Sequence, residues 1–203
     1  MADIGGIPVA RHGHLCVLYR EQSERDQLVL DLVEKGLRAG DTCLYVATEA
    51  EDAALRKKLA ADDSEVDTTW LDVREPAGRY RSGAGFTPDR MLDMIGDWSE
   101  DTFERKGSRF ARAVADMSIA LPHVGEASVG GLAGYEARVA QWSRAYPQIG
   151  VFFYDLNTLS GDTFVSMVRS HRQLWVGGVV LDNPYFVDPC QRDDARGRGG
   201  SRQ

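Results

Sequence analysis

Polar and aromatic side chains that could hold a small molecule stand at or beside the ends of the predicted strands. In an open parallel sheet, ligands bind outside the carboxyl ends of the strands. The candidates at these ends are Tyr19, Arg20, Glu49, Asp116, Met117, Tyr154 and Asp155. Arg112 on a strand face and Glu136 on a predicted helix complete the set. This mixture of hydroxyl, thioether and charged groups suits a small organic ligand in a mostly apolar pocket. For Tyr19, Met117 and Tyr154, packing in the core is the competing interpretation.

Three of the charged candidates have a specific expectation. Arg112 and Asp116 lie four residues apart on one face of a predicted strand, because side chains alternate between the two faces. They form either a buried ion pair or two polar walls of a pocket, and both interpretations stay open. Glu136 is on the inward side of its predicted helix. An unpaired buried carboxylate is costly, which makes Glu136 a candidate for a site.

The sequence offers no pattern for metal-dependent or nucleophilic catalysis. Its four histidines and three cysteines show no metal-ligand spacing, and the sequence lacks the G-x-S-x-G motif of a nucleophilic serine. His14 and His171 are far apart in the sequence, and each either titrates near neutral pH or packs against a helix end. We therefore expect no catalytic residue, no metal and no cofactor.

The element that must position the first candidates is a strand–helix–strand unit over residues 14–49. Residues 15–19 and 43–47 are short apolar runs typical of buried strands. Apolar residues recur at helical spacing between them, and Gly40 stands where a glycine commonly ends a helix. Such a unit is nearly always parallel and right-handed.

The corner between the first strand and its helix, residues 20–26, decides whether the unit binds a nucleotide. A phosphate loop has the pattern G-x-x-x-x-G-K-[ST], and this corner has no glycine and no lysine. Glu21, Glu24 and Asp26 would repel phosphate at the helix N-terminus, and Ser23 with Asp26 predicts the helix start as a capping box. The corner indicates a nucleotide-type scaffold whose nucleotide site has been replaced.

Strands and helices alternate along the rest of the chain. Predicted strands cover residues 66–73, 110–117, 149–156 and 174–181, and predicted helices cover 51–60, 88–106, 132–146 and the segment that opens at Ser160. In that last helix we expect Phe164, Val165 and Val168 to face inward. The alternation predicts an open, mainly parallel α/β sheet flanked by helices on both faces.

The chain is predicted to form one domain over residues 12–187. A loose lead-in at residues 1–11 precedes it, and a disordered tail rich in glycine, arginine and aspartate follows at residues 188–203. The loop at residues 74–85 carries several arginines and glycines. It is either a lid over the pocket or a plain surface loop.

Composition narrows the class of protein. The 203 residues carry a formal net charge of -7, which argues against direct binding of nucleic acid. The longest apolar runs are too short to span a bilayer. Three cysteines without a C-x-x-C motif indicate a reducing, cytoplasmic setting.

Short motifs, taken in order, resemble the MEDS domain, the sensory domain named after methanogen and methylotroph regulators and the dichloromethane-responsive repressor. They lie between residues 12 and 185 and are His14-Leu15-Cys16-Val17-Leu18-Tyr19, Gly36-Leu37-Arg38-Ala39-Gly40-Asp41, Cys43-Leu44-Tyr45-Val46, Phe86-Thr87-Pro88-Asp89, Arg112 with Asp116-Met117, Tyr135-Glu136-Ala137, Tyr154-Asp155, His171 and Asn183-Pro184-Tyr185. The resemblance implies a fold related to the RecA/KaiC ATPases without a working phosphate loop. It also implies a sensory role, proposed for small hydrocarbon derivatives, beside a DNA-binding or kinase-type output domain.

Three hypotheses about function follow. The first is a cytoplasmic sensor that binds a small organic ligand and signals to a regulator, a kinase or a second copy of itself. The second is a scaffold that docks a kinase or anti-sigma-type partner and needs no ligand. The third is an enzyme, which is disfavoured because the corner at residues 20–26 lacks a phosphate loop. Asp155 stands where a RecA-type ATPase holds its magnesium-binding aspartate, and without a phosphate loop we expect a hydrogen-bonding or capping role instead.

Overall fold

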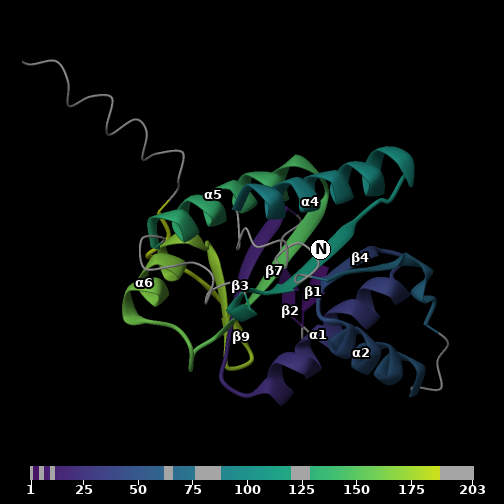
Figure 1. The fold of residues 1–203 in the computed structure, drawn as a ribbon, viewed down its shortest axis with the longest axis horizontal. Helices are drawn as coiled ribbons and strands as arrows, with labels where there is room; N and C mark the ends of the chain where they lie inside the picture. Colours follow the sequence, from purple (N-terminus) through teal and green to yellow (C-terminus); the bar gives the residue numbers. More distant parts are fainter. Residues whose placement is uncertain are drawn as a thin grey trace, which may run out of the picture.

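A seven-stranded sheet forms the centre of the computed structural model, which describes residues 2–4, 7–9, 12–61, 66–75, 88–119 and 129–187 (Figure 1). The strand order is β5-β4-β6-β7-β3-β8-β9. All neighbours are parallel except β8 and β9. The strands are β3 (Gly13–Tyr19), β4 (Thr42–Val46), β5 (Leu71–Arg74), β6 (Ala111–Asp116), β7 (Gln148–Asp155), β8 (Gln173–Val176) and β9 (Val179–Asp182).

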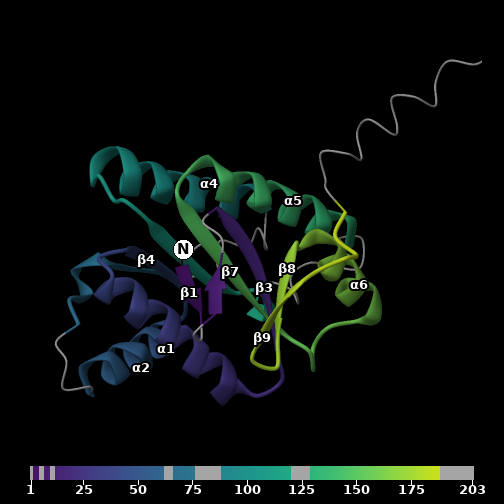
Figure 2. The ribbon, with the colours of Figure 1, turned by 180° about the vertical axis from the view of Figure 1, so that it is seen from behind.

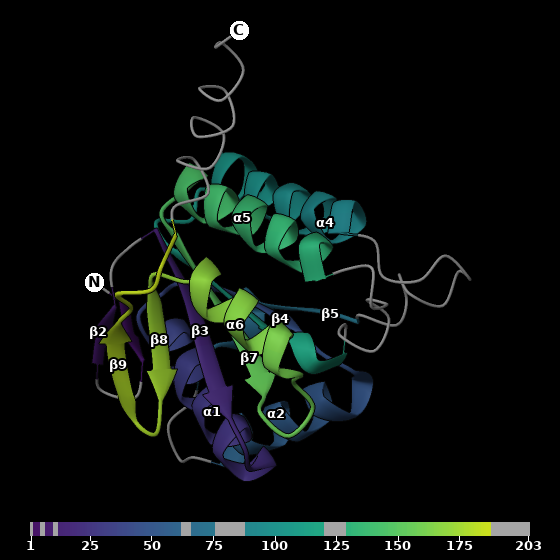
Figure 3. The ribbon, with the colours of Figure 1, turned by 90° about the vertical axis from the view of Figure 1, so that its left-hand side faces the viewer.

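Helices cover both faces of this sheet, as predicted (Figures 1 and 2). The longer helices are α1 (Gln22–Arg38) and α2 (Glu49–Ala61) on one face, and α4 (Pro88–Glu100), α5 (Val129–Ala145) and α6 (Gly161–Ser170) on the other. Shorter elements are the 3-10 helices η1 (Thr68–Trp70) and η3 (Met117–Ile119) and the π-helical turn η2 (Asp101–Arg105). Figure 3 shows the two helical layers from the side.

Two hydrophobic cores result, one on each face. In β3, Leu15, Val17 and Tyr19 belong to the core under α1 and α2. The alternate residues Cys16 and Leu18 belong to the core under α4, α5 and α6. Both sides of the strand are buried, which explains its nearly continuous apolar sequence. His14 is two residues before Cys16, so its side chain lies on the same face of the strand, the side of α5 and α6.

The first helix ends as predicted but starts earlier. Gly40 has a φ of 76° and follows the last helical turn, as a C-terminal glycine should. The helix begins at Gln22 after an extended Glu21, which makes no side-chain capping bond. The predicted cap at Ser23 is therefore wrong, because Ser23 already lies within the first turn.

The end of the domain differs more from the prediction. The single strand expected at residues 174–181 is a hairpin, β8 and β9, turned at Gly177 and Gly178. Both glycines have positive φ, the conformation of the tight turns that glycine pairs favour in hairpins.

Of the three residues that were expected to face inward from α6, Val168 does pack against the core, but Phe164 and Val165 do not. Met167 is 1% exposed, whereas Phe164 and Val165 are 38% and 47% exposed. Ser160 does cap the helix, since its hydroxyl accepts a hydrogen bond from the Thr163 amide.

Two other segments depart from expectation. The strand expected at residues 66–73 begins only at Leu71, after the 3-10 turn. The lead-in contains an antiparallel hairpin of β1 (Ala2–Ile4) and β2 (Ile7–Val9). Most of the possible lid and the whole predicted tail lie outside the described residues. Within the described residues, no helix has the length and apolar character that crossing a membrane requires.

Candidate functional site

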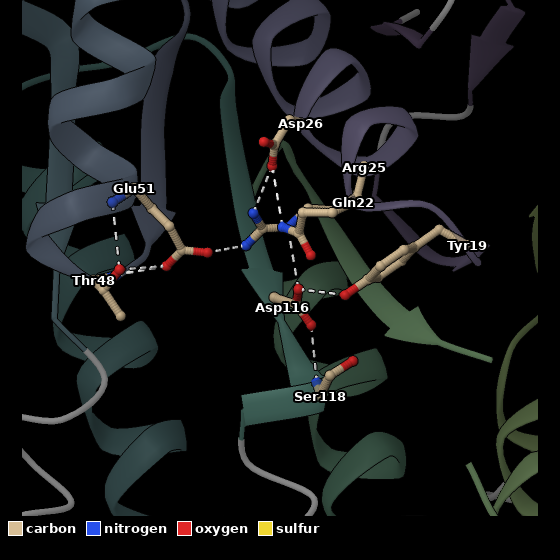
Figure 4. A network of polar contacts seen from close by, with 8 residues as sticks. All are labelled: Tyr19, Gln22, Arg25, Asp26, Thr48, Glu51, Asp116 and Ser118. Carbon is tan, nitrogen blue, oxygen red and sulfur yellow. Dashed lines mark hydrogen bonds and ion pairs between the residues drawn. The ribbon is translucent and has the colours of Figure 1, made fainter. Parts of the chain in front are cut away.

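A buried guanidinium lies at the carboxyl ends of the central strands. Arg25 is in the first turn of α1, which follows β3 directly, and the residue is only 2% exposed. Its guanidinium contacts Asp26 at 2.7 Å and Asp116 at 3.1 Å, and it also pairs with Glu51. We call these four residues the arginine cluster (Figure 4). It joins α1, α2 and β6 at the edge where open parallel sheets bind ligands.

Each carboxylate in the arginine cluster has further donors. Glu51 accepts hydrogen bonds from the backbone and hydroxyl of Thr48 at 2.9 and 2.8 Å. Asp116 accepts the Tyr19 hydroxyl at 2.8 Å and the Ser118 amide at 2.9 Å. Asp26 accepts the Gln22 side-chain amide at 3.2 Å. The anions are thus held in place by more than the arginine.

Protonation follows from this arrangement. Burial alone would lower the pKa of Arg25, but Tyr45 and the surrounding carboxylates raise it overall. Burial would raise the pKa of Glu51, yet the Thr48 hydrogen bonds and Arg25 lower it overall. Burial and the adjacent Asp116 raise the pKa of Tyr19. Around neutral pH, Arg25 and Glu51 are charged and Tyr19 keeps its proton.

A hollow of about 90 Å³ opens beside the arginine cluster, between α1 and α2. Its walls combine apolar side chains with hydrogen-bonding ones. They are Gln22, Arg25, Asp26, Val29, Tyr45, Glu51, Ala54, Leu55 and Lys58. A hollow of this size admits a molecule of only a few heavy atoms.

A second polar group lies on the opposite face of the sheet. The Nε2 atom of His14 is 3.1 Å from Glu136 Oε2 and 3.1 Å from His171 Nε2, and His171 Nε2 is 3.4 Å from the same Glu136 oxygen. All three side chains are at most 6% exposed. They come from β3, α5 and the end of α6, and we call them the histidine cluster. The Tyr154 hydroxyl donates to the other Glu136 oxygen.

The hydrogen bonds assign the tautomer of His171. Its Nδ1 atom is 2.9 Å from the Met167 carbonyl, which only accepts, so Nδ1 carries the proton and Nε2 keeps a lone pair in the neutral ring. Burial, then His171, lowers the pKa of His14 to about 4, so this ring is neutral at pH 7. Burial would raise the pKa of Glu136, but the two histidines lower it overall.

A second hollow, of about 160 Å³, reaches the histidine cluster from the side. It is lined by His12, Gly13, His14, Ala140, Ser143, Arg144, Ser170, Arg172, Gln173 and Phe186. It brings solvent close to the His14 ring, which is otherwise packed edge-on against Phe152.

Among the described residues, polar contacts divide four of the nine candidate residues between the two clusters. Tyr19 and Asp116 meet at the arginine cluster, and Glu136 and Tyr154 meet at the histidine cluster. None of the nine lines either hollow. The remaining five are Arg20, Glu49, Arg112, Met117 and Asp155.

Arg112 and Asp116 are not partners, so the proposed ion pair between them is wrong. Arg112 Nε donates to Asp41 at 2.8 Å, and a second nitrogen donates to the Leu32 carbonyl. Asp116 pairs with Arg25 instead. The residues share a face, but four residues along a strand separate them by roughly 13 Å.

The other four residues have simpler environments. Met117 is 1% exposed in the core under α4 and α5. Arg20 and Glu49 are exposed. Asp155 accepts hydrogen bonds from the backbone and side-chain amides of Asn157, which is a turn-capping arrangement.

Sequence reasoning missed the residues at the centre of both clusters. Arg25 lies inside the corner that was interpreted through its acids and its lack of glycine and lysine, and Glu51 was noted only as the start of a predicted helix. His14 and His171 were considered separately because 157 positions separate them. The available signal was that His14 stands at the beginning of a predicted strand and His171 at the end of a predicted helix.

Comparisons with known proteins agree with this architecture. A sequence profile described as the MEthanogen/methylotroph, DcmR Sensory domain (MEDS) matches residues 13–172. The transcriptional repressor DcmR of Methylorubrum extorquens (strain DSM 6343 / CIP 106787 / DM4) is 26% identical over an alignment of 179 residues. The match covers 85% of this chain and 63% of the repressor. The chain thus spans 63% of the length of this curated relative.

A solved structure supports the fold. The crystal structure of the KaiC-like protein PH0186 from Pyrococcus horikoshii OT3 aligns with a TM-score of 0.57 at 13% identity, over 84% of this chain and 73% of that one. Identity this low supports a conclusion about fold alone. It confirms the predicted KaiC-like α/β architecture.

Proposed function

The chain belongs to the MEDS family of sensory domains, and from this premise we propose that it detects a small organic molecule for a transcriptional regulator or a two-component-type signalling protein. The repressor DcmR supports the regulatory part of this proposal. The arginine cluster is the observation that carries the rest. It lies at the strand ends, where an ATPase of related fold would hold phosphates.

The arginine cluster disfavours a nucleotide. A phosphate needs free backbone amides and free cations at the helix N-terminus. Arg25 is already engaged by three carboxylates, and Glu24 adds another acid to the first turn of α1. A polyphosphate would meet more negative than positive charge here. We therefore propose that the domain recognises its ligand and does not hydrolyse a nucleotide.

The hollow beside Arg25 fits a small organic ligand. Val29, Tyr45 and Leu55 offer apolar walls, while Arg25 and Glu51 offer a donor and an acceptor. A ligand with an acceptor atom, such as a hydroxyl, carbonyl or halogen, would compete with Glu51 for the guanidinium.

This competition supplies a mechanism for signalling. Glu51 is in the first turn of α2 and Arg25 is in the first turn of α1. Loosening their contact would change how the two helices pack. A ligand that binds the loosened arrangement better shifts the population toward it.

An exposed alanine tests the proposed position of the ligand. Ala54 lines the hollow, whereas its neighbour Ala53 does not, and both are exposed on α2. Wild type is screened by thermal shift and native mass spectrometry against short halogenated compounds, alcohols and ketones. We expect Ala54→Phe to abolish binding of any hit and Ala53→Phe to retain it.

Three results would contradict the proposal. If no compound in a broad panel binds, the proposal of an organic ligand is wrong. If both variants bind a hit equally well, the ligand does not occupy the hollow beside Arg25. If calorimetry shows that ATP or ADP binds at this corner, the domain binds a nucleotide after all, and the argument that the ion pairs of Arg25 exclude phosphate is wrong.

We further propose that the output passes through contact with a protein partner, either a regulator, a kinase or a second copy. Val179 and Leu181 on the terminal strand β9 are 52% and 49% exposed, and exposed apolar side chains at a sheet edge favour association. A Leu181→Glu change should weaken self-association or partner capture. Unchanged size-exclusion behaviour and unchanged capture would argue against β9.

A further inference from the structure

We propose that His14, Glu136 and His171 bind a divalent transition-metal ion of the zinc type. Three protein ligands would hold it and a fourth position would stay open. This inference does not depend on the organic ligand or its position. It concerns the other face of the sheet.

The ligand atoms already have the right separations. His14 Nε2, His171 Nε2 and Glu136 Oε2 lie 3.1, 3.1 and 3.4 Å from one another. Around a tetrahedral zinc ion with bonds of about 2.0–2.1 Å, ligand atoms lie about 3.3–3.4 Å apart. An ion at their centre would therefore reach all three with small shifts. Two histidines and one glutamate are also an established donor set for zinc sites with three protein ligands.

One acceptor in the histidine cluster lacks a hydrogen-bond partner among the described residues, because Glu136 Oε2 is buried and accepts no hydrogen bond from them. With its proton on Nδ1, the neutral His171 ring also presents a lone pair at Nε2. His14 Nε2 can supply one hydrogen to these two acceptors. A buried acceptor without a full partner is costly. A cation would satisfy all three atoms together.

The surrounding contacts are those that orient metal ligands. A metal-binding histidine commonly donates its other ring N–H to a carbonyl, and ligating carboxylates are themselves hydrogen-bonded. His171 donates to the Met167 carbonyl, and the Tyr154 hydroxyl donates to Glu136. Asn183 donates to the His171 carbonyl at 2.7 Å and so fixes the backbone at this point.

An entry path exists on the His14 side. The hollow of about 160 Å³ reaches the His14 ring and is bordered by Ser143, Ser170 and Gln173. An ion could enter here, and water or a ligand atom could occupy its open position. The competing interpretation is a metal-free hydrogen-bonded triad that only joins β3 to α5 and α6.

Metal titration separates these two interpretations. Full-length protein is stripped with a chelator and titrated with Co²⁺, whose visible absorption reports the coordination geometry, and bound Zn²⁺ is counted by elemental analysis. We expect one equivalent per chain with a tetrahedral or five-coordinate spectrum. Glu136→Gln and His171→Asn should lose stoichiometric binding. His12→Gln is the matched control, since His12 borders the same hollow outside the cluster, and it should bind as wild type does.

A second variant and a measurement on wild type keep the test decisive if a ligand variant misfolds. Tyr154→Phe keeps the three ligands and should retain one equivalent while weakening affinity by about 10–100-fold. In wild type, Zn²⁺ should shift the Nε2 resonances of His14 and His171 and leave those of His12 unchanged. Absence of stoichiometric binding by wild type, equal binding by Glu136→Gln, or histidine resonances unmoved by Zn²⁺ would overturn the proposal.

Discussion

The arginine cluster and the histidine cluster both contain carboxylates and a buried cationic or imidazole side chain, yet they are satisfied differently. The Arg25 guanidinium contacts three carboxylates, although its buried Nε donates no hydrogen bond to the described residues, and each carboxylate has another donor besides. In the histidine cluster, a carboxylate and two imidazoles converge on one point with few hydrogens between them. The carboxylates of the first cluster share a cation, whereas we propose that the second cluster binds one.

Their positions explain the difference. The arginine cluster fills the edge where open parallel sheets bind ligands, and its one cation is held by three carboxylates. The histidine cluster lies within the layer between the sheet and helices α5 and α6, where burial makes every unmet lone pair costly. One face of the sheet thus carries a cluster of ion pairs, while the other carries a convergent set of histidine and carboxylate groups. Breaking each cluster separately tests this contrast.

Removing the cation of the arginine cluster should have the largest effect. Arg25→Met leaves three carboxylates around an apolar side chain and should destabilise the protein by about 3–5 kcal/mol. Urea unfolding followed by circular dichroism measures the change. Arg38→Met is the matched control, because Arg38 is at the exposed end of the same helix and pairs with Glu34. It should cost less than about 0.5 kcal/mol. Equal effects in the two variants would show that Arg25 is not central.

Removing one hydroxyl from each cluster should have an intermediate and unequal effect. Tyr154→Phe deprives Glu136 of a donor at full burial and should cost about 2 kcal/mol in chelator-treated protein, whereas Tyr19→Phe should cost about 1 kcal/mol. The smaller value is expected because Asp116 keeps Arg25 and the Ser118 amide. Urea unfolding of both variants gives the comparison. A larger loss for Tyr19→Phe would reverse our view of which cluster is self-sufficient.

Much of the fold could be predicted from the sequence because its signals are local. Apolar runs set the buried strands, and Gly40 and Pro88 mark helix ends. The failures also have local causes. The Gly177–Gly178 pair was not recognised as a hairpin turn, and the apolar Phe164 and Val165 were assumed to be buried although α6 turns Met167 toward the core.

The sites could be predicted only in part, because their partners come from different elements. Tyr19 and Asp116 were named from strand ends, yet nothing in the sequence places Arg25 between them. An ion pair between Arg112 and Asp116 was one of two open interpretations, whereas the structure pairs Arg112 with Asp41 from the turn after α1. The convergence of His14 and His171 depends on β8 lying next to β3, and ligand spacing within a motif cannot show that.

The smallest expected effect is the pH dependence of stability that comes from Glu51 in the arginine cluster. The folded-state pKa of Glu51 is lowered, since Thr48 and Arg25 outweigh the effect of burial. Its contribution to stability is therefore present above the unfolded pKa, about 4.3, and is lost as the pH falls below that value. Glu51→Gln should cost about 1 kcal/mol at pH 7, and the gap from wild type should narrow in acid.

Glu49→Gln provides the matched control for this last change, because Glu49 is in the same first turn of α2 but is exposed. Both variants lose one negative charge near the helix N-terminus, so the helix dipole affects them alike. A gap that closes in acid for Glu51→Gln but not for Glu49→Gln would assign the effect to the contact with Arg25. Parallel behaviour of the two variants would mean that the arginine cluster holds α2 by packing, and the proposed competition between ligand and Glu51 would lose its basis.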